Sequence, residues 1–336
     1  DRLASYGASH VRVFAGGGGT ISSEEIRELE SYGVERVYSP NDGLRLGLDG
    51  MIDDVVARAR AVVRPTLGVG AHGELTPEHP ANLARAVSAL EEGACSLDAL
   101  LPALAGSQRP PVVGLTGTGG AGKSSLLDEL LLRFLAAFPT YRIGVLAVDP
   151  TRRRTGGALL GDRIRMNALA NERLFMRSLA TRRQHLATAK VLQDSIGLFT
   201  RAGFDLVLVE TAGIGQSDTE IVDLVDLSMY VMTSDFGAPS QLEKIDMIDF
   251  ADLIVLNKFE RRGAQDALRE IRKQWRRNRV SFETPDHEVP VYPAIASRFN
   301  DEGVNRLFDA LCRALREQAT AGSAQGAAND DGARGG

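Results

Sequence analysis

Residues 117–125, "GTGGAGKSS", decide the fold class of this chain. Four apolar residues precede the stretch (112–115, "VVGL"), and a leucine-rich run follows it (126–135, "LLDELLLRFL"). The pattern predicts a buried strand, a glycine turn and the start of a helix, whose backbone amides point at a bound phosphate. We therefore expect a P-loop protein with an α/β fold.

The stretch matches the motif G-x-x-x-x-G-K-[ST] at every fixed position. The Lys123 ammonium is expected to reach the β- and γ-phosphates, and the Ser124 hydroxyl is expected to bind Mg²⁺. The glycines let the backbone wrap closely around the phosphates. The residues expected to bind the nucleotide in this loop are Gly117, Gly119, Gly120, Ala121, Gly122, Lys123, Ser124 and Ser125.

After residue 110 the chain alternates apolar stretches with helical ones. The expected strands cover 111–117, 142–149, 205–211, 227–234, 252–258 and 289–296. Near-continuous apolar strands separated by helices are typical of a mainly parallel sheet covered on both faces. We predict a P-loop NTPase domain over 110–318. Residues 319–336 lack bulky apolar side chains and are predicted to be a disordered tail.

The first 109 residues carry a different pattern. Residues 10–16 and 35–40 are expected to be strands, and 22–34 and 46–63 to be helices. This α/β segment, 1–64, is too short for a doubly wound sheet, so we expect it to be the later part of a larger domain. An Ala- and Leu-rich pattern indicates a helical linker over 65–109.

Composition narrows the possible partners. The formal net charge is −5, so no basic excess is available to neutralise nucleic-acid phosphates. No apolar run approaches the ~18 residues that a membrane span requires. The two cysteines, Cys95 and Cys312, lie far apart in the sequence and form no metal-ligand cluster. We predict a cytoplasmic protein that binds neither nucleic acid nor membrane.

A second motif, "LIVLNKFE" (253–260), favours guanine nucleotides. It resembles the N-K-x-D motif of GTPases, in which a carboxylate accepts hydrogen bonds from the guanine N1 and exocyclic amine. Asn257 is expected to contact the base edge and the P-loop region, and the Lys258 stem to pack on the ring. Glu260 supplies the carboxylate on a side chain one methylene longer than aspartate, which leaves the strength of the preference for GTP over ATP open.

Two further stretches supply candidate metal and switch residues. In "LVLVETAGIGQSD" (206–218), Glu210 can hold Mg²⁺ through water and the Gly213 amide can bind the γ-phosphate. In 145–167, Asp149 ends a strand and Asp162 follows a glycine-rich loop, so both acids can lie near the metal. The candidate metal ligands are Ser124, Asp149, Asp162 and Glu210. The candidate catalytic residues are Lys123, Asp149 and Gln216, the glutamine by analogy with GTPases that use one to orient the attacking water.

Together, GTGGAGKSS, AVDPTRRRTGGALLGDRIRM, VETAGIGQSD and NKFE resemble the G-protein chaperones of adenosylcobalamin-dependent acyl-CoA mutases. The similarity is greatest to the GTPase domain fused within isobutyryl-CoA mutase, and it covers roughly residues 80–318. It implies a SIMIBI-class GTPase fold, Mg²⁺-dependent hydrolysis of GTP to GDP, and control of cofactor loading and protection of the mutase. It also implies that Asp162 and Glu210 join Ser124 around Mg²⁺, and that 241–252 is a mobile switch.

The N-terminal segment carries its own resemblance. Residues 11–40 resemble the C-terminal half of a flavodoxin-like cobalamin-binding domain, in which a glycine-rich turn, here Gly16 to Gly19, admits the nucleotide tail of the cofactor. The D-x-H-x-x-G motif, whose histidine ligates cobalt in that family, is absent, and His10 lies in no such context. We therefore expect 1–64 to be a partial cobalamin-binding domain, with adenosylcobalamin bound only by a longer parent protein.

These expectations describe a GTP-driven conformational switch whose partners are a guanine nucleotide and the domains of a cobalamin-dependent mutase, and we expect a homodimer. Two alternatives stay open. A GTPase that inserts a metal into another protein would carry a His- or Cys-rich site, whereas the five His residues here do not cluster in the sequence. A small-molecule kinase would use the P-loop for phosphoryl transfer, and the NKFE stretch would then have no role.

Overall fold

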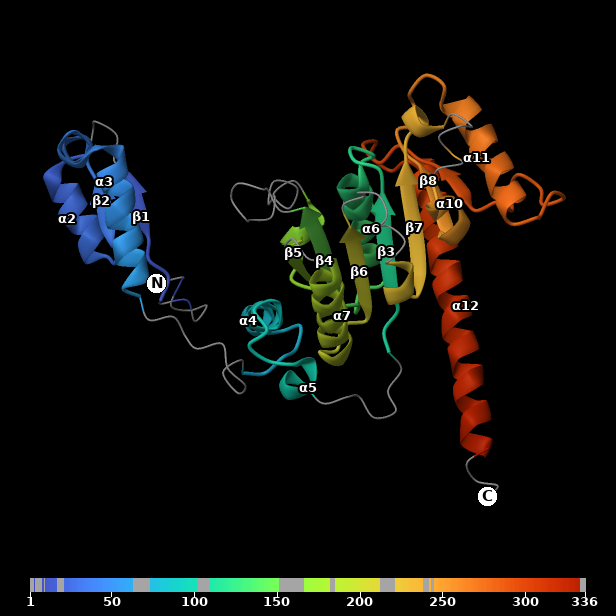
Figure 1. The fold of residues 1–336 in the computed structure, drawn as a ribbon, viewed down its shortest axis with the longest axis horizontal. Helices are drawn as coiled ribbons and strands as arrows, with labels where there is room; N and C mark the ends of the chain where they lie inside the picture. The colour runs from blue at the N-terminus through green and yellow to red at the C-terminus, as the bar shows by residue number, and fades with distance from the viewer. Residues whose placement is uncertain are drawn as a thin grey trace. The chain divides into compact units, whose positions relative to one another are not determined.

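A computed structural model describes the backbone of the chain except residues 1–2, 4–7, 9, 17–20, 63–72, 102–108, 151–165, 182–184, 212–220, 238–241, 243–244 and 333–336. Side chains are also left undescribed at 149–150, 180–181, 185–188, 319 and 321–332. The chain divides into two compact units, Asp1–Ala71 and His72–Gly336 (Figure 1), and each is described by itself.

A seven-stranded, all-parallel sheet forms the centre of the second unit. Its strands are β3 (Val112–Gly117), β4 (Ile143–Pro150), β5 (Leu174–Thr181), β6 (Leu206–Thr211), β7 (Leu227–Met232), β8 (Leu253–Leu256) and β9 (Val291–Pro293). They lie in the order β5-β4-β6-β3-β7-β8-β9, which places the P-loop strand β3 at the centre (Figure 1). The predicted parallel α/β sheet is confirmed.

Strand β5 is the one member of this sheet that the sequence pattern did not predict. It pairs only with β4 and is therefore an edge strand. Arg177 and Ser178 interrupt its apolar run, so it lacks the continuous hydrophobic pattern of a central strand. Nη2 of Arg177 donates 2.9 Å hydrogen bonds to the Ser88 hydroxyl and to the Glu91 carboxylate, both of which lie outside the sheet.

Helices cover both faces of the sheet. On one face, α4 (Pro80–Glu91), α5 (Leu97–Leu100) and α7 (His185–Arg201) contribute to a core cluster that includes Leu83, Leu198 and Val207. On the other, α6 (Lys123–Ala137) and α12 (Glu302–Gly332) pack with Leu126, Leu307 and Val113. Neighbouring strand residues thus alternate between the two cores, as a sheet buried on both faces requires.

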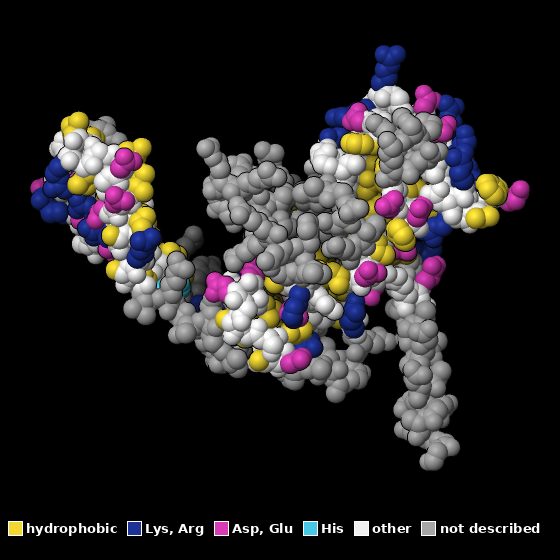
Figure 2. All heavy atoms as spheres, in the orientation of Figure 1, with side chains coloured by type: hydrophobic (Ala, Val, Ile, Leu, Met, Phe, Trp, Pro, Cys, Tyr) yellow, Lys and Arg dark blue, Asp and Glu magenta, His cyan; other side chains and the backbone are white. Residues whose placement is uncertain are grey.

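Two further helices pack against the end of the sheet formed by β7, β8 and β9. Helices α10 (Met247–Phe250) and α11 (Ala264–Asn278) pack over β7, β8 and β9 through residues such as Ile248, Ile271 and Ile254. Basic side chains gather over the region of α11 (Figure 2). The half-buried Arg272 and Arg276 of this helix pair with Asp286. The second unit also contains three short 3-10 helices: η2 (Ala168–Ala170), η3 (Val222–Leu224) and η4 (Ser234–Phe236).

Aspartates that precede three of the strands hold neighbouring strands in register. Asp205, before β6, accepts a 2.7 Å hydrogen bond from the Arg142 amide at the start of β4. Asp226, before β7, accepts one of 2.7 Å from the Val112 amide of β3. Asp252, before β8, accepts one of 2.7 Å from the amide of Ser228 in β7. Each carboxylate satisfies an amide that the sheet ladder leaves free, which fixes where the strands begin.

The segment predicted as a linker, 65–109, belongs in part to the second unit. The unit begins at His72, and its helix α4 buries Leu83, Ala86, Val87, Ala89 and Leu90. Residues 80–91 are therefore part of the P-loop core and do not only connect it. At the other end, α12 continues over 319–332, where composition predicts a disordered tail. The five alanines of this stretch favour a helix and its three glycines disfavour one, so the extension depends on the stable turns of α12 that precede it.

The first unit contains two parallel strands, β1 (Phe14–Gly16) and β2 (Arg36–Tyr38), and the helices α2 (Ser23–Ser31) and α3 (Pro40–Arg60). Ser22 and Ser39 each form a capping box at the start of a helix. Hydrogen bonds from the Ser39 backbone and hydroxyl hold the pKa of the Asp42 carboxyl below its ordinary value. The Ser39 cap starts α3 before the predicted residue 46, and the chain kinks at Gly47 (φ 65°).

Few side chains of the first unit are buried. Val37 is 1% exposed, whereas Leu44, Leu48 and Tyr32 are 87%, 69% and 82% exposed. A two-stranded sheet with so small a core does not reach the size at which sheets are stable by themselves.

Among the described residues of the whole chain, no helix has the length and apolar character needed to cross a membrane.

Candidate functional site

The P-loop begins at a glycine that no other residue can replace without a clash. Gly117 ends β3 with φ 144°, and a Cβ built on it would lie 1.9 Å from the Val231 carbonyl oxygen of the neighbouring strand β7. The next amide, that of Thr118, donates a hydrogen bond to the same oxygen at 3.2 Å. The first glycine of the motif is therefore required by the close approach of β7 as well as by the phosphate cradle.

The second fixed glycine sets the start of helix α6. Gly122 is left-handed (φ 88°) and occupies the N-cap position, so Lys123 and Ser124 form the first turn. A Cβ at Gly122 would lie 2.6 Å from Nδ2 of Asn257. The helix N-terminus and its free amides thus face the loop that the sequence predicts to hold phosphate.

The Lys123 ammonium lies over the loop. Its Nζ donates to the carbonyl oxygens of Gly117 at 2.9 Å and Thr118 at 3.2 Å. The side chain is therefore held inside the cradle, where an ammonium can exchange carbonyl partners for phosphate oxygens.

Ser124 and Glu210 form the candidate metal site. The Ser124 hydroxyl donates a 2.7 Å hydrogen bond to Oε1 of Glu210, which lies near the end of β6 and is 9% exposed. Strands β3 and β6 are adjacent and in register, with Leu115 opposite Glu210, and this pairing brings the two side chains together. A hydroxyl and a carboxylate are oxygen donors of the kind that Mg²⁺ prefers, so the two residues fit a Mg²⁺ ion. Among the described residues, no group of three or more His, Cys, Asp or Glu side chains could hold a metal ion.

Asn257 joins the guanine-type motif to the P-loop. It follows β8 and is 2% exposed. Its Nδ2 donates to the Ala121 carbonyl at 2.8 Å, and its Oδ1 accepts from the Ala296 amide at 3.0 Å. The predicted contact of Asn257 with the P-loop region is present. The same side-chain carboxamide is also hydrogen-bonded to the segment that follows β9.

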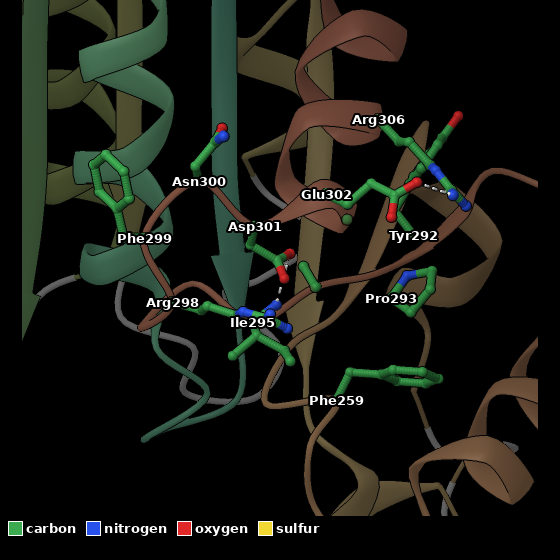
Figure 3. Close-up of a pocket in the computed structure, with 12 residues that line it drawn as sticks. Phe259, Tyr292, Pro293, Ile295, Arg298, Phe299, Asn300, Asp301, Glu302 and Arg306 are labelled. Carbon is green, nitrogen blue, oxygen red and sulfur yellow. Dashed lines mark hydrogen bonds and ion pairs between the residues drawn. The ribbon is translucent and has the colours of Figure 1, made fainter.

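The next residues of that motif lie beside the cradle and at the surface. Lys258 is left-handed (φ 57°), and its Nζ donates to the Gly120 carbonyl at 2.7 Å. Glu260 is exposed. A hollow of about 530 Å³ lies between the NKFE segment and the segment that follows β9. Phe259, Ile295 and Arg298 are among the residues that line it (Figure 3).

Several predicted site residues lie outside the described part of the structure. These are Asp162, Gly213, Gln216 and the glycines 17–19. Asp149 is described only in its backbone, which belongs to β4 next to β6. Their roles stay predictions.

Two buried acids near the site were missing from the sequence prediction. Asp128 on α6, 7% exposed, accepts hydrogen bonds from the amides of Asn167 at 3.0 Å and Ala168 at 2.8 Å. Asp301, also 7% exposed, accepts from the amides of Ile295 and Val304. An acid within an apolar helical run ("LLDELLL") is a usable signal for Asp128, because a buried carboxylate needs partners. No comparable signal marks Asp301.

The all-parallel sheet, the glycine-lined loop after β3 and the Ser124–Glu210 pair define a P-loop protein. The fold agrees with a solved structure of a LAO/AO transport system kinase, at a TM-score of 0.52 and 22% identity over 77% of this chain and 82% of that one. Residues 83–333 match the family model of the methylmalonyl-CoA mutase-associated GTPase MeaB. The chain belongs to this family, and the resemblance predicted from the motifs is confirmed.

Named relatives agree with this assignment. A fused isobutyryl-CoA mutase of Geobacillus kaustophilus is 49% identical over 332 residues, which make up 95% of this chain and 30% of the relative. A fused isobutyryl-CoA mutase of Cupriavidus metallidurans is 51% identical over 322 residues, or 94% of this chain and 29% of the relative. The GTPase ArgK of Escherichia coli is 38% identical over 166 residues, 48% of each chain. The chain therefore spans less than a third of the length of the two fused mutases.

Proposed function

We propose that this protein is a Mg²⁺-dependent GTPase whose hydrolysis of GTP to GDP works as a conformational switch. The observation that carries the proposal is the Asn257 side chain, which ties the NKFE segment to the P-loop through the 2.8 Å bond to Ala121. A guanine-type reading motif and a phosphate cradle are thereby side by side. Membership of a family of GTPases supports the same activity.

The chain's own residues would divide the work of hydrolysis. Lys123 would bind the β- and γ-phosphates, and Ser124 with Glu210 would hold Mg²⁺. The ion would supply positive charge that neutralises the charge developing during phosphoryl transfer. Glu260, exposed beside Lys258, would accept hydrogen bonds from the guanine edge. Asp149 and Asp162 near the metal, Gly213 as the sensor of the γ-phosphate and Gln216 on the attacking water complete the proposed set.

The proposed target of the switch is an adenosylcobalamin-dependent acyl-CoA mutase of the isobutyryl-CoA mutase type, whose cofactor loading and protection it would gate. Similarity to two fused isobutyryl-CoA mutases along nearly the whole of this chain supports this partner. We further propose that residues 1–64 are part of a cobalamin-binding domain. The similarity to the two fused isobutyryl-CoA mutases, which extends along nearly the whole of this chain, supports this. Cobalamin would need the rest of that domain to bind.

We also propose that the protein acts in the cytoplasm as a homodimer, without nucleic-acid or membrane partners. The net charge of −5 supports the absence of nucleic acid.

The test is release of phosphate by the purified 336-residue chain with Mg²⁺ and either GTP or ATP. We expect slow turnover of GTP, no comparable turnover of ATP, and faster GTP turnover when mutase domains are added. Lys123→Ala is the control and should abolish nucleotide binding while the chain stays folded.

Other outcomes point to the alternatives. Equal turnover of ATP contradicts the assignment of NKFE to guanine. Transfer of phosphate to a metabolite in place of its release identifies a kinase. Stoichiometric binding of nickel identifies a metallocentre-insertion protein.

A further inference from the structure

The segment between β9 and α12 is held at its far end by one carboxylate. Oδ1 of Asp301 accepts hydrogen bonds from the Val304 amide at 3.0 Å and from the Ile295 amide at 3.1 Å. The Asp301 carbonyl accepts the first intrahelical bond of α12, from the Asn305 amide at 3.0 Å. Asp301 is therefore the N-cap of α12, and the same oxygen also holds the chain six residues earlier (Figure 3).

The first turn of α12 lies directly against the end of β9. A Cβ added to Gly303 would lie 2.0 Å from the Pro293 carbonyl oxygen and 3.0 Å from Cα of Ala294. Helix and strand approach so closely that only glycine fits at this position. The start of α12 is thereby packed against the end of β9.

The residue after Ile295 connects this anchor to the nucleotide site. The Ala296 amide donates to Oδ1 of Asn257, and Nδ2 of Asn257 donates to the Ala121 carbonyl of the P-loop. Asn257 and Asp301 are 2% and 7% exposed; the two Asn257 bonds are buried, and the bond between Asp301 and Ile295 is half-buried. A continuous line of buried and half-buried hydrogen bonds thus runs from the start of α12, through the backbone of Ile295 and Ala296, to the phosphate cradle.

We infer that Asp301 is a positioning residue for recognition of the guanine base. By holding Ile295, its carboxylate sets the Ala296 amide against Asn257 and keeps the segment 295–298 beside the NKFE segment. The inference rests on the proposed guanine specificity and assigns it a determinant outside the recognised motifs. In the described part of the chain the Asp301 side chain bonds to Ile295 and Val304 and not to the P-loop, so its loss should change selectivity between bases more than affinity for phosphates.

The decisive variant separates the two roles of the Asp301 carboxylate, which caps α12 and accepts the hydrogen bond from the Ile295 amide. Serine caps helices as well as aspartate does, but its hydroxyl stands on a shorter side chain that cannot also serve Ile295. We expect Asp301→Ser to keep the thermal stability close to that of the unaltered chain and to bind GDP about tenfold more weakly, with ADP affinity unchanged. Asp301→Asn keeps an acceptor oxygen of the same reach and should restore the GDP-to-ADP affinity ratio.

The measurement is titration of GDP and of ADP with Mg²⁺ into the full chain. Ser96→Ala, which removes the cap of α5 by leaving the Ala99 amide without its 3.3 Å partner, is the matched control and should leave the ratio unchanged. An unaltered ratio in Asp301→Ser, or equal losses for GDP and ADP, overturns the inference. An unmodified chain that binds both nucleotides equally overturns the guanine assignment itself, and this role for Asp301 with it.

Discussion

The Ser124 hydroxyl donates a 2.7 Å hydrogen bond to Oε1 of Glu210, a residue 86 positions later in the chain. The two groups meet because β3 and β6 are adjacent parallel strands whose carboxyl ends reach the same edge of the sheet. A serine at a helix start and an acid at a strand end therefore become one oxygen-donor pair.

Removing the charge of this pair should impair hydrolysis more than folding. Glu210→Gln keeps an acceptor for Ser124 but loses the negative charge that Mg²⁺ requires. We expect Mg²⁺-dependent GTP hydrolysis to fall by about 100-fold, measured as phosphate release over a Mg²⁺ titration. Glu270→Gln on α11 is the control and should leave the rate unchanged. An unaltered Mg²⁺ dependence in Glu210→Gln would show that the carboxylate does not serve the metal.

The first glycine of the P-loop should be essential for stability. In Gly117→Ala the added Cβ would meet the Val231 carbonyl at 1.9 Å in a backbone conformation (φ 144°) that disfavours side chains. We expect the free energy of unfolding to fall by at least ~3 kcal/mol, as measured by urea denaturation without nucleotide. Gly119→Ala, whose Cβ would meet no atom of the described residues within 4 Å, should stay within about 0.5 kcal/mol of the unaltered chain. Equal stability of the two variants would contradict this account.

Asn257 should contribute to both stability and nucleotide affinity. Asn257→Ala leaves the Ala121 carbonyl and the Ala296 amide without their present partner in a buried position. We expect a loss of about 2 kcal/mol or more in the free energy of unfolding and weaker GDP binding. Asn257→Asp retains the acceptor for Ala296 but sets a carboxylate against the Ala121 carbonyl, so it should not rescue the affinity. Full GDP affinity in either variant would exclude the bridging role.

Glu260 should determine the preference for guanine. Glu260→Ala removes the only carboxylate that the motif offers to the base edge, and we expect the ratio of GTP to ATP affinity to fall about tenfold. Glu260→Asp shortens the side chain to the usual length and should keep the ratio or raise it. Competition of each nucleotide against a fluorescent GDP analogue measures both. If alanine leaves the ratio as it was, the base is read elsewhere.

Helix α4 should behave as part of the P-loop unit. Arg177 on β5 pairs with Glu91 of α4 at 2.9 Å, and their side chains are 27% and 15% exposed. We expect Arg177→Ala to lower the free energy of unfolding by about 1–3 kcal/mol because it leaves the Glu91 carboxylate without its ion-pair partner. GDP affinity should not change, since the pair lies outside the proposed site. Arg269→Ala on the exposed face of α11 is the control and should have little effect.

Short sequence patterns predict those elements whose structure depends on residues close together in the chain. Strand β3, the glycine turn and helix α6 were predictable because a buried strand, a phosphate cradle and a helix start each need particular residues at fixed spacing. Strand β5 was not predictable, because Arg177 interrupts the apolar pattern of the strand. The partner of Arg177 is Glu91, which lies in helix α4, 86 residues earlier in the chain. The start of α3 was missed because the chain kinks at Gly47 and the Ser39 cap lies before the apolar run.

The sequence by itself determined the phosphate cradle and the class of nucleotide that we propose for it. Those assignments rest on motifs whose chemistry is complete within a few residues. Only the tertiary structure decided what joins the motifs: the strand order that brings Glu210 to Ser124, the Asn257 bridge, and the anchoring of Ile295 by Asp301. Hydrogen bonds between residues so far apart depend on which strands are neighbours and where each strand ends, and no local spacing encodes either.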